Sequence, residues 1–98
     1  MNEFTEQQKK TIAQNIKDGG YEKIEHVVWA LEEYAQFRIG KGGFLTAVLE
    51  NDLFKAFNRA DLENGRNLFL ICKYVWNYLP GSSWGSPAKV DQWLKGGR

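Results

Sequence analysis

Apolar residues recur along this chain at intervals of three and four, and glycine, proline and capping residues interrupt the pattern. Such spacing predicts amphipathic α-helices, and no stretch alternates for long enough to predict a strand. We therefore expect an all-α fold, a compact bundle of about five helices over residues 5–17, 21–39, 44–57, 62–79 and 87–95. Residues 1–98 should form a single domain, because a chain of 98 residues is long enough for one core and too short for two.

Three of the expected helices have clear start signals. Thr5 and Gln8 have the spacing of a capping box, and Asp61 is placed to cap the helix over 62–79. Before the last helix, Ser86 is a capping residue and Pro87 fills the first helical position, where its missing N–H is not needed. These signals place the helix starts within a few residues.

The helix over 62–79 is the most apolar of the five and should be the central one. It is apolar on more than one side, which favours a homo-oligomer. In the helix over 44–57, Asp52 falls within the apolar arc, where a carboxylate needs a partner. Arg59 is the candidate, and we interpret Asp52 and Arg59 as a structural pair more readily than as a ligand contact.

Charge and composition disfavour several functions. The 13 Lys and Arg residues against 12 Asp and Glu leave a net charge of +1, too little for the positive field of a nucleic-acid-binding protein. One cysteine, Cys72, excludes an internal disulfide, and one histidine, His26, excludes a histidine-based metal site. No apolar run is long enough to span a membrane and the start of the chain lacks a secretory signal, so we expect a cytoplasmic protein.

We find no pattern of catalytic residues, and we expect neither an enzyme nor a cofactor. Phosphate-loop and strand-linked dinucleotide motifs are missing. His26 should be exposed, since it lies far from the apolar stripe of the helix over 21–39. The pairs Glu32-Glu33 and Asp61 with Glu63 are expected to lie on solvated helix faces.

The glycine-rich segment between the second and third helices is a candidate anion site. Lys41, Gly42 and Gly43 precede a helix start, where backbone N–H groups and the helix dipole favour a phosphate or carboxylate, and Arg38 adds a nearby cation. The alternative is that these glycines only make a tight connection.

Two tryptophans suggest further contacts. Trp29 should point away from the apolar stripe of its helix and, with Phe37, could anchor a partner protein; packing under the first helix is the alternative. Trp84, in a loop that leads to Ser86 and a helix start, could stack on a nucleobase beside free N–H groups. The alternative for Trp84 is a plug at the end of the core.

Several of these residues belong to a pattern that resembles a family of small uncharacterised phage and prophage proteins. The pattern spans residues 40 to 95 and consists of GGFLTAVL at 42–49, NDL at 51–53, RAD at 59–61, WGSP at 84–87 and the pairs KV at 89–90 and WL at 93–94. The resemblance implies an accessory protein made in an infected bacterium, a class that includes inhibitors of host defence. It implies no activity and no assigned site.

Three functions fit this background. A noncatalytic protein that modulates or inhibits a host defence factor would use Trp29, Phe37 and an acidic helix face. A sponge that sequesters a nucleotide signal would use the glycine-rich loop, Arg59 and Trp84 at a subunit interface. A small DNA-binding domain is disfavoured, because the helix over 62–79 is too apolar to read bases. We expect the first function.

Overall fold

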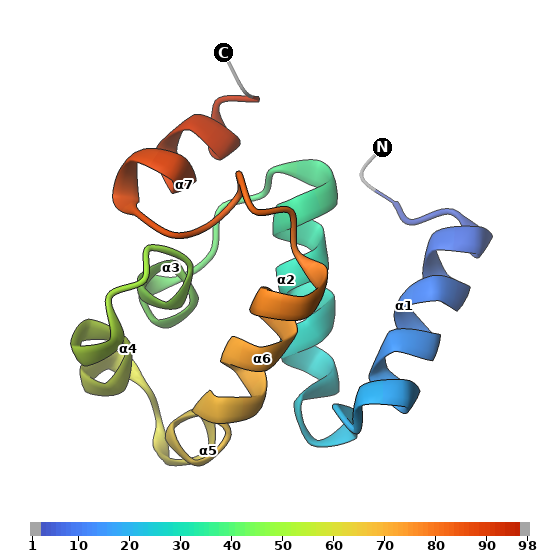
Figure 1. The fold of residues 1–98 in the computed structure, drawn as a ribbon, viewed down its shortest axis with the longest axis horizontal. Helices are drawn as coiled ribbons and strands as arrows, with labels where there is room; N and C mark the ends of the chain where they lie inside the picture. Colours follow the sequence, from blue (N-terminus) through green and yellow to red (C-terminus); the bar gives the residue numbers. More distant parts are fainter. Residues whose placement is uncertain (1–2, 97–98) are drawn as a thin grey trace.

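The computed structural model of the chain describes residues 3–96, and its ordered elements are all helical (Figure 1). In chain order these are α1 (Glu6–Gly19), the 3-10 turn η1 (Glu22–Ile24), α2 (Glu25–Phe37), α3 (Gly43–Leu49), α4 (Leu53–Arg59), α5 (Leu62–Arg66), α6 (Leu68–Tyr78) and α7 (Pro87–Leu94). The predicted all-α class is confirmed. The predicted number of helices is too low, since the described residues form seven α-helices instead of about five.

The helix expected over 44–57 is interrupted between α3 and α4. Asn51 adopts a left-handed backbone with φ of 63°, which ends the helical path. Asp52 then caps α4, where its carboxylate accepts a hydrogen bond from the backbone N–H of Lys55 at 3.1 Å. The prediction that Asp52 lies in the apolar arc of one continuous helix is therefore wrong, and its side chain is exposed.

The helix expected over 62–79 is also divided. Asp61 caps α5 as predicted, by accepting from Asn64 N at 2.7 Å. At Asn67 the backbone leaves the helical region, with φ of −101° and ψ of 9°, and α6 starts at the next residue. Near the middle of the chain, α2 ends two residues before the predicted Ile39 because Arg38 is left-handed, with φ of 58°.

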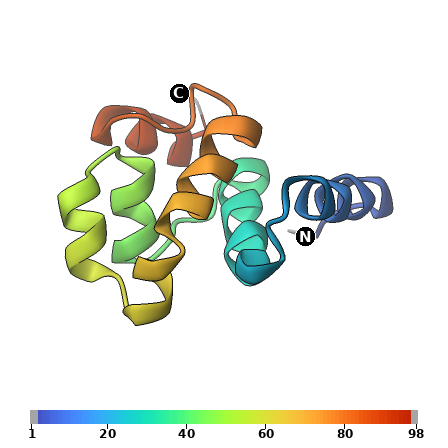
Figure 2. The same ribbon diagram turned by 60° about the horizontal axis from the view of Figure 1, so that its bottom comes forward.

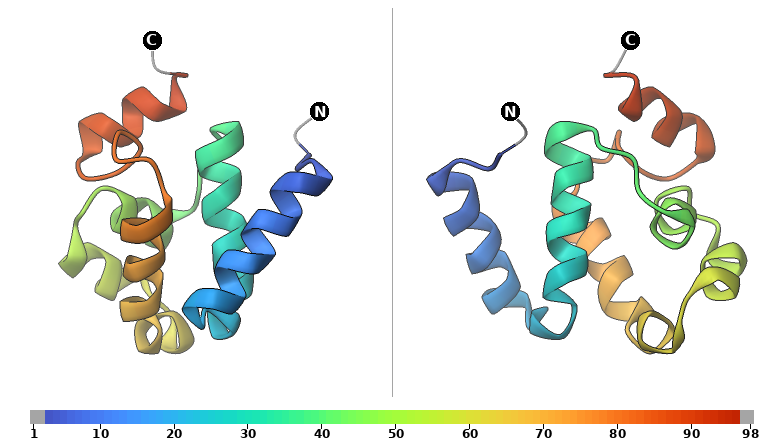
Figure 3. Two further views of the ribbon diagram at one scale, coloured as in Figure 1. Left: turned by 45° about the vertical axis from the view of Figure 1, so that its right-hand side comes forward. Right: turned by 180° about the vertical axis from the view of Figure 1, so that it is seen from behind.

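The helices are arranged around α2 and α6, which pack against each other in the middle of the molecule (Figures 1 and 2). On one side α1 packs against α2, and on the other side α3 and α4 form a helical hairpin. The short α5 leads into α6, and α7 packs on α3 (Figure 3). The predicted central position of the 62–79 segment is therefore confirmed for its second part, α6.

The core contains side chains from nearly every element. Its largest share comes from α2 and α6, and η1, α1, α3, α4 and α7 add further buried side chains. The core residues are Ile12, Ile16, Tyr21, Ile24, Val27, Val28, Leu31, Tyr34, Ala35, Ala47, Val48, Leu49, Ala56, Leu68, Ile71, Tyr74, Val75, Leu79 and Val90. None of the helices within residues 3–96 has the length and apolar content that crossing a bilayer requires.

Hydrogen bonds fasten the C-terminal part of the chain to α2. The buried Tyr34 Oη donates to the carbonyl of Ser83 at 2.6 Å, and Trp93 Nε1 donates to the carbonyl of Tyr34 at 3.2 Å. The Arg38 guanidinium lies 3.9 Å from the centre of the Trp93 ring and donates to the Trp93 carbonyl at 2.7 Å. These contacts hold α7 and its preceding loop against the end of α2.

Candidate functional site

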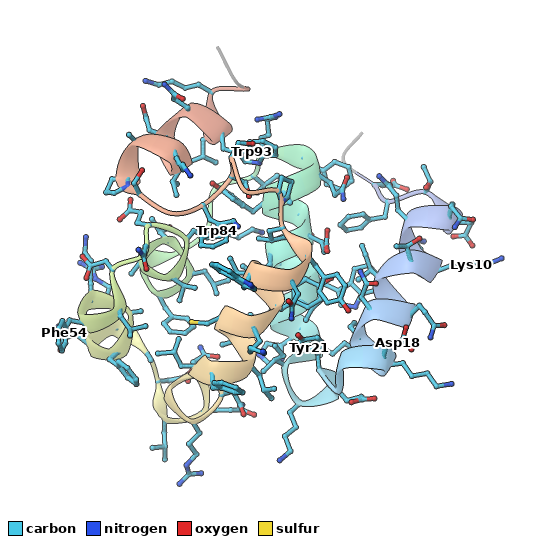
Figure 4. The ribbon with its side chains drawn as sticks, viewed as in Figure 1. Lys10, Asp18, Tyr21, Phe54, Trp84 and Trp93 are labelled. Carbon is cyan, nitrogen blue, oxygen red and sulfur yellow. The ribbon has the colours of Figure 1, made fainter. Side chains whose placement is uncertain are left out.

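The largest concentration of exposed apolar side chains lies on α4, α5 and α6. Phe54 is 90% exposed, Phe69 is 72% exposed and Trp76 is 71% exposed, and the neighbouring leucines and phenylalanine are more than half exposed. Five of these side chains line adjoining depressions, and we call them the apolar face: Leu53, Phe57, Leu62, Phe69 and Trp76. Phe54 lies on the outer side of α4 (Figure 4). Side chains of this size are normally covered in a folded protein.

Helical spacing explains how the apolar face forms. Phe69 and Trp76 are seven residues apart in α6, so they lie on one side of that helix while Ile71 and Val75 enter the core. On α4, Leu53 and Phe57 are four residues apart and face the same way. Two amphipathic helices thus turn part of their apolar surface outward.

The apolar face is hollowed along its length by three adjoining depressions. The first, of about 440 Å³, lies between Phe57, Leu62 and Arg66, and the second, of about 410 Å³, shares Phe57 and Arg66 with it and continues to Phe69 and Cys72. The third, of about 250 Å³, shares Cys72 with the second and is lined by two tryptophans and Asn51. Neighbouring depressions share lining residues, and we call the three together the groove.

Trp84 lines the end of this groove. Trp84 is labelled in Figure 4. Its ring centre lies 5.5 Å from that of Trp76, and its Nε1 is the one buried side-chain donor within residues 3–96 that has no hydrogen-bond partner. Burial of a donor without an acceptor costs free energy, about 1–3 kcal/mol. Trp84 lies at the edge of the core and beside the groove. This position is compatible with both predictions for Trp84, closing the end of the core and contacting a ligand.

The two cations of the predicted anion site are paired within the chain. Lys41 Nζ binds Glu33 Oε1 at 2.7 Å and is nearly buried, and Arg38 binds the carbonyl and ring of Trp93. The helix that follows Gly42, α3, has only seven residues. The segment makes a tight connection, the alternative named above, and its two cations are already paired within the chain.

Arg59 does not pair with Asp52. The ion pairs found among residues 3–96 do not include these two residues, and Asp52 caps α4 instead. The Arg59 side chain lies over Gly43, where an added Cβ would approach its Nη1 to 2.6 Å. The predicted structural pair is therefore wrong, because a separate helix start gives Asp52 a backbone N–H as its partner.

The residues proposed for a nucleotide are not brought together. Ser86 caps α7 by accepting from Lys89 N at 3.2 Å, as its capping role predicts. None of the cavities described for residues 3–96 is lined by both Trp84 and Arg59 or by both Trp84 and Lys41. The geometry gives no shared pocket for a base and its phosphate.

Trp29 and Phe37 are partly buried inside the molecule. Phe4 packs against both, with ring centres 5.4 Å from Trp29 and 4.8 Å from Phe37. The prediction of an exposed Trp29 is wrong, and the alternative, packing beneath the N-terminal segment, describes what is seen. The expected solvated position of Glu32 is also wrong, since that residue is 4% exposed.

The structure also places the single histidine and the single cysteine of the chain. His26 is exposed. Among residues 3–96, no three His, Cys, Asp or Glu side chains come together in a way that could hold a metal ion. Burial raises the pKa of the Cys72 thiol, which lies half-buried beside the groove.

Comparison of the chain with protein-family models, curated proteins and solved structures found no match. The resemblance to phage and prophage proteins stays a prediction.

Proposed function

We propose that this chain is a noncatalytic binding protein that holds a segment of a partner protein in the groove of its apolar face. The observation that carries the proposal is the exposed area. At about 200 Å² for a fully exposed large side chain, the five residues of the apolar face present on the order of 600 Å². One partner in a standard protein interface buries about 800 Å², and the largest apolar patch of a typical monomer is about 300–600 Å².

The groove favours an amphipathic helix or another apolar segment as the occupant. Its three depressions lie in series, so they suit side chains that recur along a partner segment. Trp76 and Phe69 are the aromatic type that dominates binding energy at interfaces.

The biological setting is proposed from the phage resemblance. We infer that the partner is a bacterial host protein, such as a defence factor, and that the chain acts in the host cytoplasm. The residues used differ from the earlier expectation, because Trp29 and Phe37 pack on Phe4 and the apolar face lies on α4 to α6.

Site-directed photo-crosslinking in bacterial cells tests this function. A photoreactive benzoylphenylalanine at Phe69 reports contacts of the apolar face, and the same group at Lys10, on the opposite edge of the molecule, is the control (Figure 4). We expect one host protein to be linked from position 69 and not from position 10. The purified pair should then form a complex of defined stoichiometry.

Two outcomes contradict the proposal. Adducts that form equally from both positions, or not at all, would exclude a specific contact at the apolar face. An adduct only with a second copy of the chain would replace the host protein by self-association. The same surface also suits a second copy, because residues of both charges, Asp61 and Arg66, line it.

A further inference from the structure

A second recess, unrelated to the apolar face, lies where α1 meets α2. It has a volume of about 290 Å³. Its α1 side presents Gln7, Thr11 and Asn15, and its α2 side presents Glu32 and Gln36. Gln8, Ile12 and Tyr78 complete the lining, which therefore combines amide and hydroxyl groups with one carboxylate. We call this recess the Glu32 cleft.

Glu32 lines the cleft and is only 4% exposed. Tyr74 Oη donates to Glu32 Oε2 at 2.6 Å, and Gln36 Nε2 donates to Oε1 at 3.3 Å. The ion pairs found within residues 3–96 do not include Glu32. A carboxylate buried to this extent normally has a cationic partner, and here only neutral donors face it.

The tyrosine keeps its proton in this pair. Burial, and next the hydrogen bond to Glu32, raise the pKa of Tyr74 far above its usual value. Tyr74 therefore remains a donor at neutral pH and holds one carboxylate oxygen of Glu32, a residue that also lines the cleft.

The unfilled hydrogen-bonding capacity of Glu32 indicates the kind of ligand. Each carboxylate oxygen has two acceptor positions, and one on each oxygen is used, by Tyr74 and by Gln36. One position per oxygen remains, the arrangement that the parallel N–H groups of a guanidinium fit. A guanidinium is also less strongly hydrated than an ammonium ion, so its transfer into a recess costs less.

We propose that the Glu32 cleft binds a small organic cation with a guanidinium group, anchored by Glu32 and bordered by the oxygens of Gln7, Thr11 and Asn15. The volume lies just below the range of cavities that hold drug-sized molecules, so the occupant is a small molecule or a single side-chain-sized group. Glu32 is the one acidic residue that lines the cleft. The site therefore suits N–H donors more than a metal ion, which prefers several charged ligands.

A nuclear magnetic resonance titration with agmatine tests the proposal. Its matched probe is N-carbamoylputrescine, which keeps the amine and the chain length and replaces the guanidinium by a neutral urea. We expect agmatine to shift the side-chain amide signals of Gln36 and Asn15 with a Kd on the order of 1 mM. The urea should bind at least about tenfold more weakly, equivalent to one unit of log Kd.

Two substitutions separate the anchor from its surroundings. Glu32→Gln keeps the size and an acceptor for Tyr74, and it should weaken agmatine at least about tenfold. Glu33→Gln is the control, because that neighbour pairs with Lys41 and does not line the cleft; it should leave the affinity unchanged. If Glu32→Gln unfolds the chain, Thr11→Trp fills the exposed mouth without changing the core and should abolish the shifts.

A capped Gly-Arg-Gly peptide identifies the source of the guanidinium. Tighter binding of agmatine supports a free metabolite, and tighter binding of the peptide supports an arginine side chain of another molecule. Equal affinity for agmatine and N-carbamoylputrescine, equal effects of the two glutamate substitutions, or no shift up to about 20 mM agmatine would overturn the proposal. None of these results depends on the apolar face, so the proposed function stands or falls separately.

Discussion

At the scale of single residues, two buried tyrosines connect distant parts of the chain. Tyr34 joins α2 to the loop before α7 through Ser83, and Tyr74 joins α6 to α2 through Glu32. Both hydroxyl groups are within the core, where an ionised phenolate would lose its hydration. Each hydroxyl therefore stabilises the fold only while it carries its proton.

Alkaline pH should weaken the fold through Tyr34. Burial raises its pKa from 10.0 to about 12, so the folded state binds the proton more tightly than the unfolded state. The stability is complete below pH 10.0 and is lost as the pH rises from there through about 12. Urea denaturation at several pH values should show this decline.

The control for this experiment is Tyr34→Phe. It should cost about 1–2 kcal/mol at pH 7, because the Ser83 carbonyl loses its donor. It should also make the decline above pH 10 shallower, with the remainder due to Tyr74, whose pKa is raised as well. An unchanged alkaline profile in this variant would show that Tyr34 does not contribute.

At the scale of elements, short polar segments decide where one helix becomes two. The α3 to α4 junction needs a left-handed residue followed by a cap, and Asn51 and Asp52 supply these in adjacent positions. The break folds α4 back against α3, and Leu53 and Phe57 on α4 stay more than half exposed. The apolar face therefore depends on this junction.

Substitutions at Asn51 should reveal the junction. Asn51→Val should cost about 1–3 kcal/mol, because a β-branched side chain is strained at a φ of 63°. Asn51→Gly should be close to neutral, since glycine adopts this backbone without a steric cost. Chemical denaturation measures both, and equal losses in the two variants would show that side-chain contacts, not backbone conformation, govern the position.

At the scale of the whole molecule, the apolar face and the Glu32 cleft lie on different sides of the α2 and α6 pair. The first offers area and aromatic anchors, and the second offers one charge with directed hydrogen bonds. The two surfaces therefore select different classes of ligand, a protein segment and a small cation.

An uncovered apolar face should cause self-association at high concentration. We expect light scattering to give an average mass above the 11.3 kDa of one chain, rising with concentration. The double variant Phe69→Ser with Trp76→Ser should stay monomeric. Leu94→Ser is the control, because that residue is 38% exposed and lies outside the apolar face.

If the unaltered chain keeps the mass of one chain at every concentration, self-association is contradicted. The proposal that a different protein occupies the groove would still stand. Trp76→Ser, combined with the photoreactive group at position 69, should weaken the host-protein contact in the crosslinking experiment. A variant that remains associated would place the contact elsewhere on the surface.

Local chemistry is what the sequence alone determined. The Thr5 and Gln8 capping box, the Asp61 cap and the Ser86-Pro87 start all occur as predicted, because each depends on atoms within three residues along the chain. The all-helical class follows from the spacing of apolar positions for the same reason. The asparagine and aspartate at 51 and 52 also carried a local signal for the helix break, which a continuous apolar pattern obscured.

Only the tertiary structure decided which polar faces are covered. Because α1 packs on the glutamate-rich side of α2, Glu32 is buried and Trp29 lies beneath Phe4, although periodicity places both toward solvent. The partners of Arg38 and Lys41 and the outward position of Phe69 and Trp76 likewise depend on residues far away in sequence. Helical periodicity describes one helix at a time, and burial is set by the helices that pack against it.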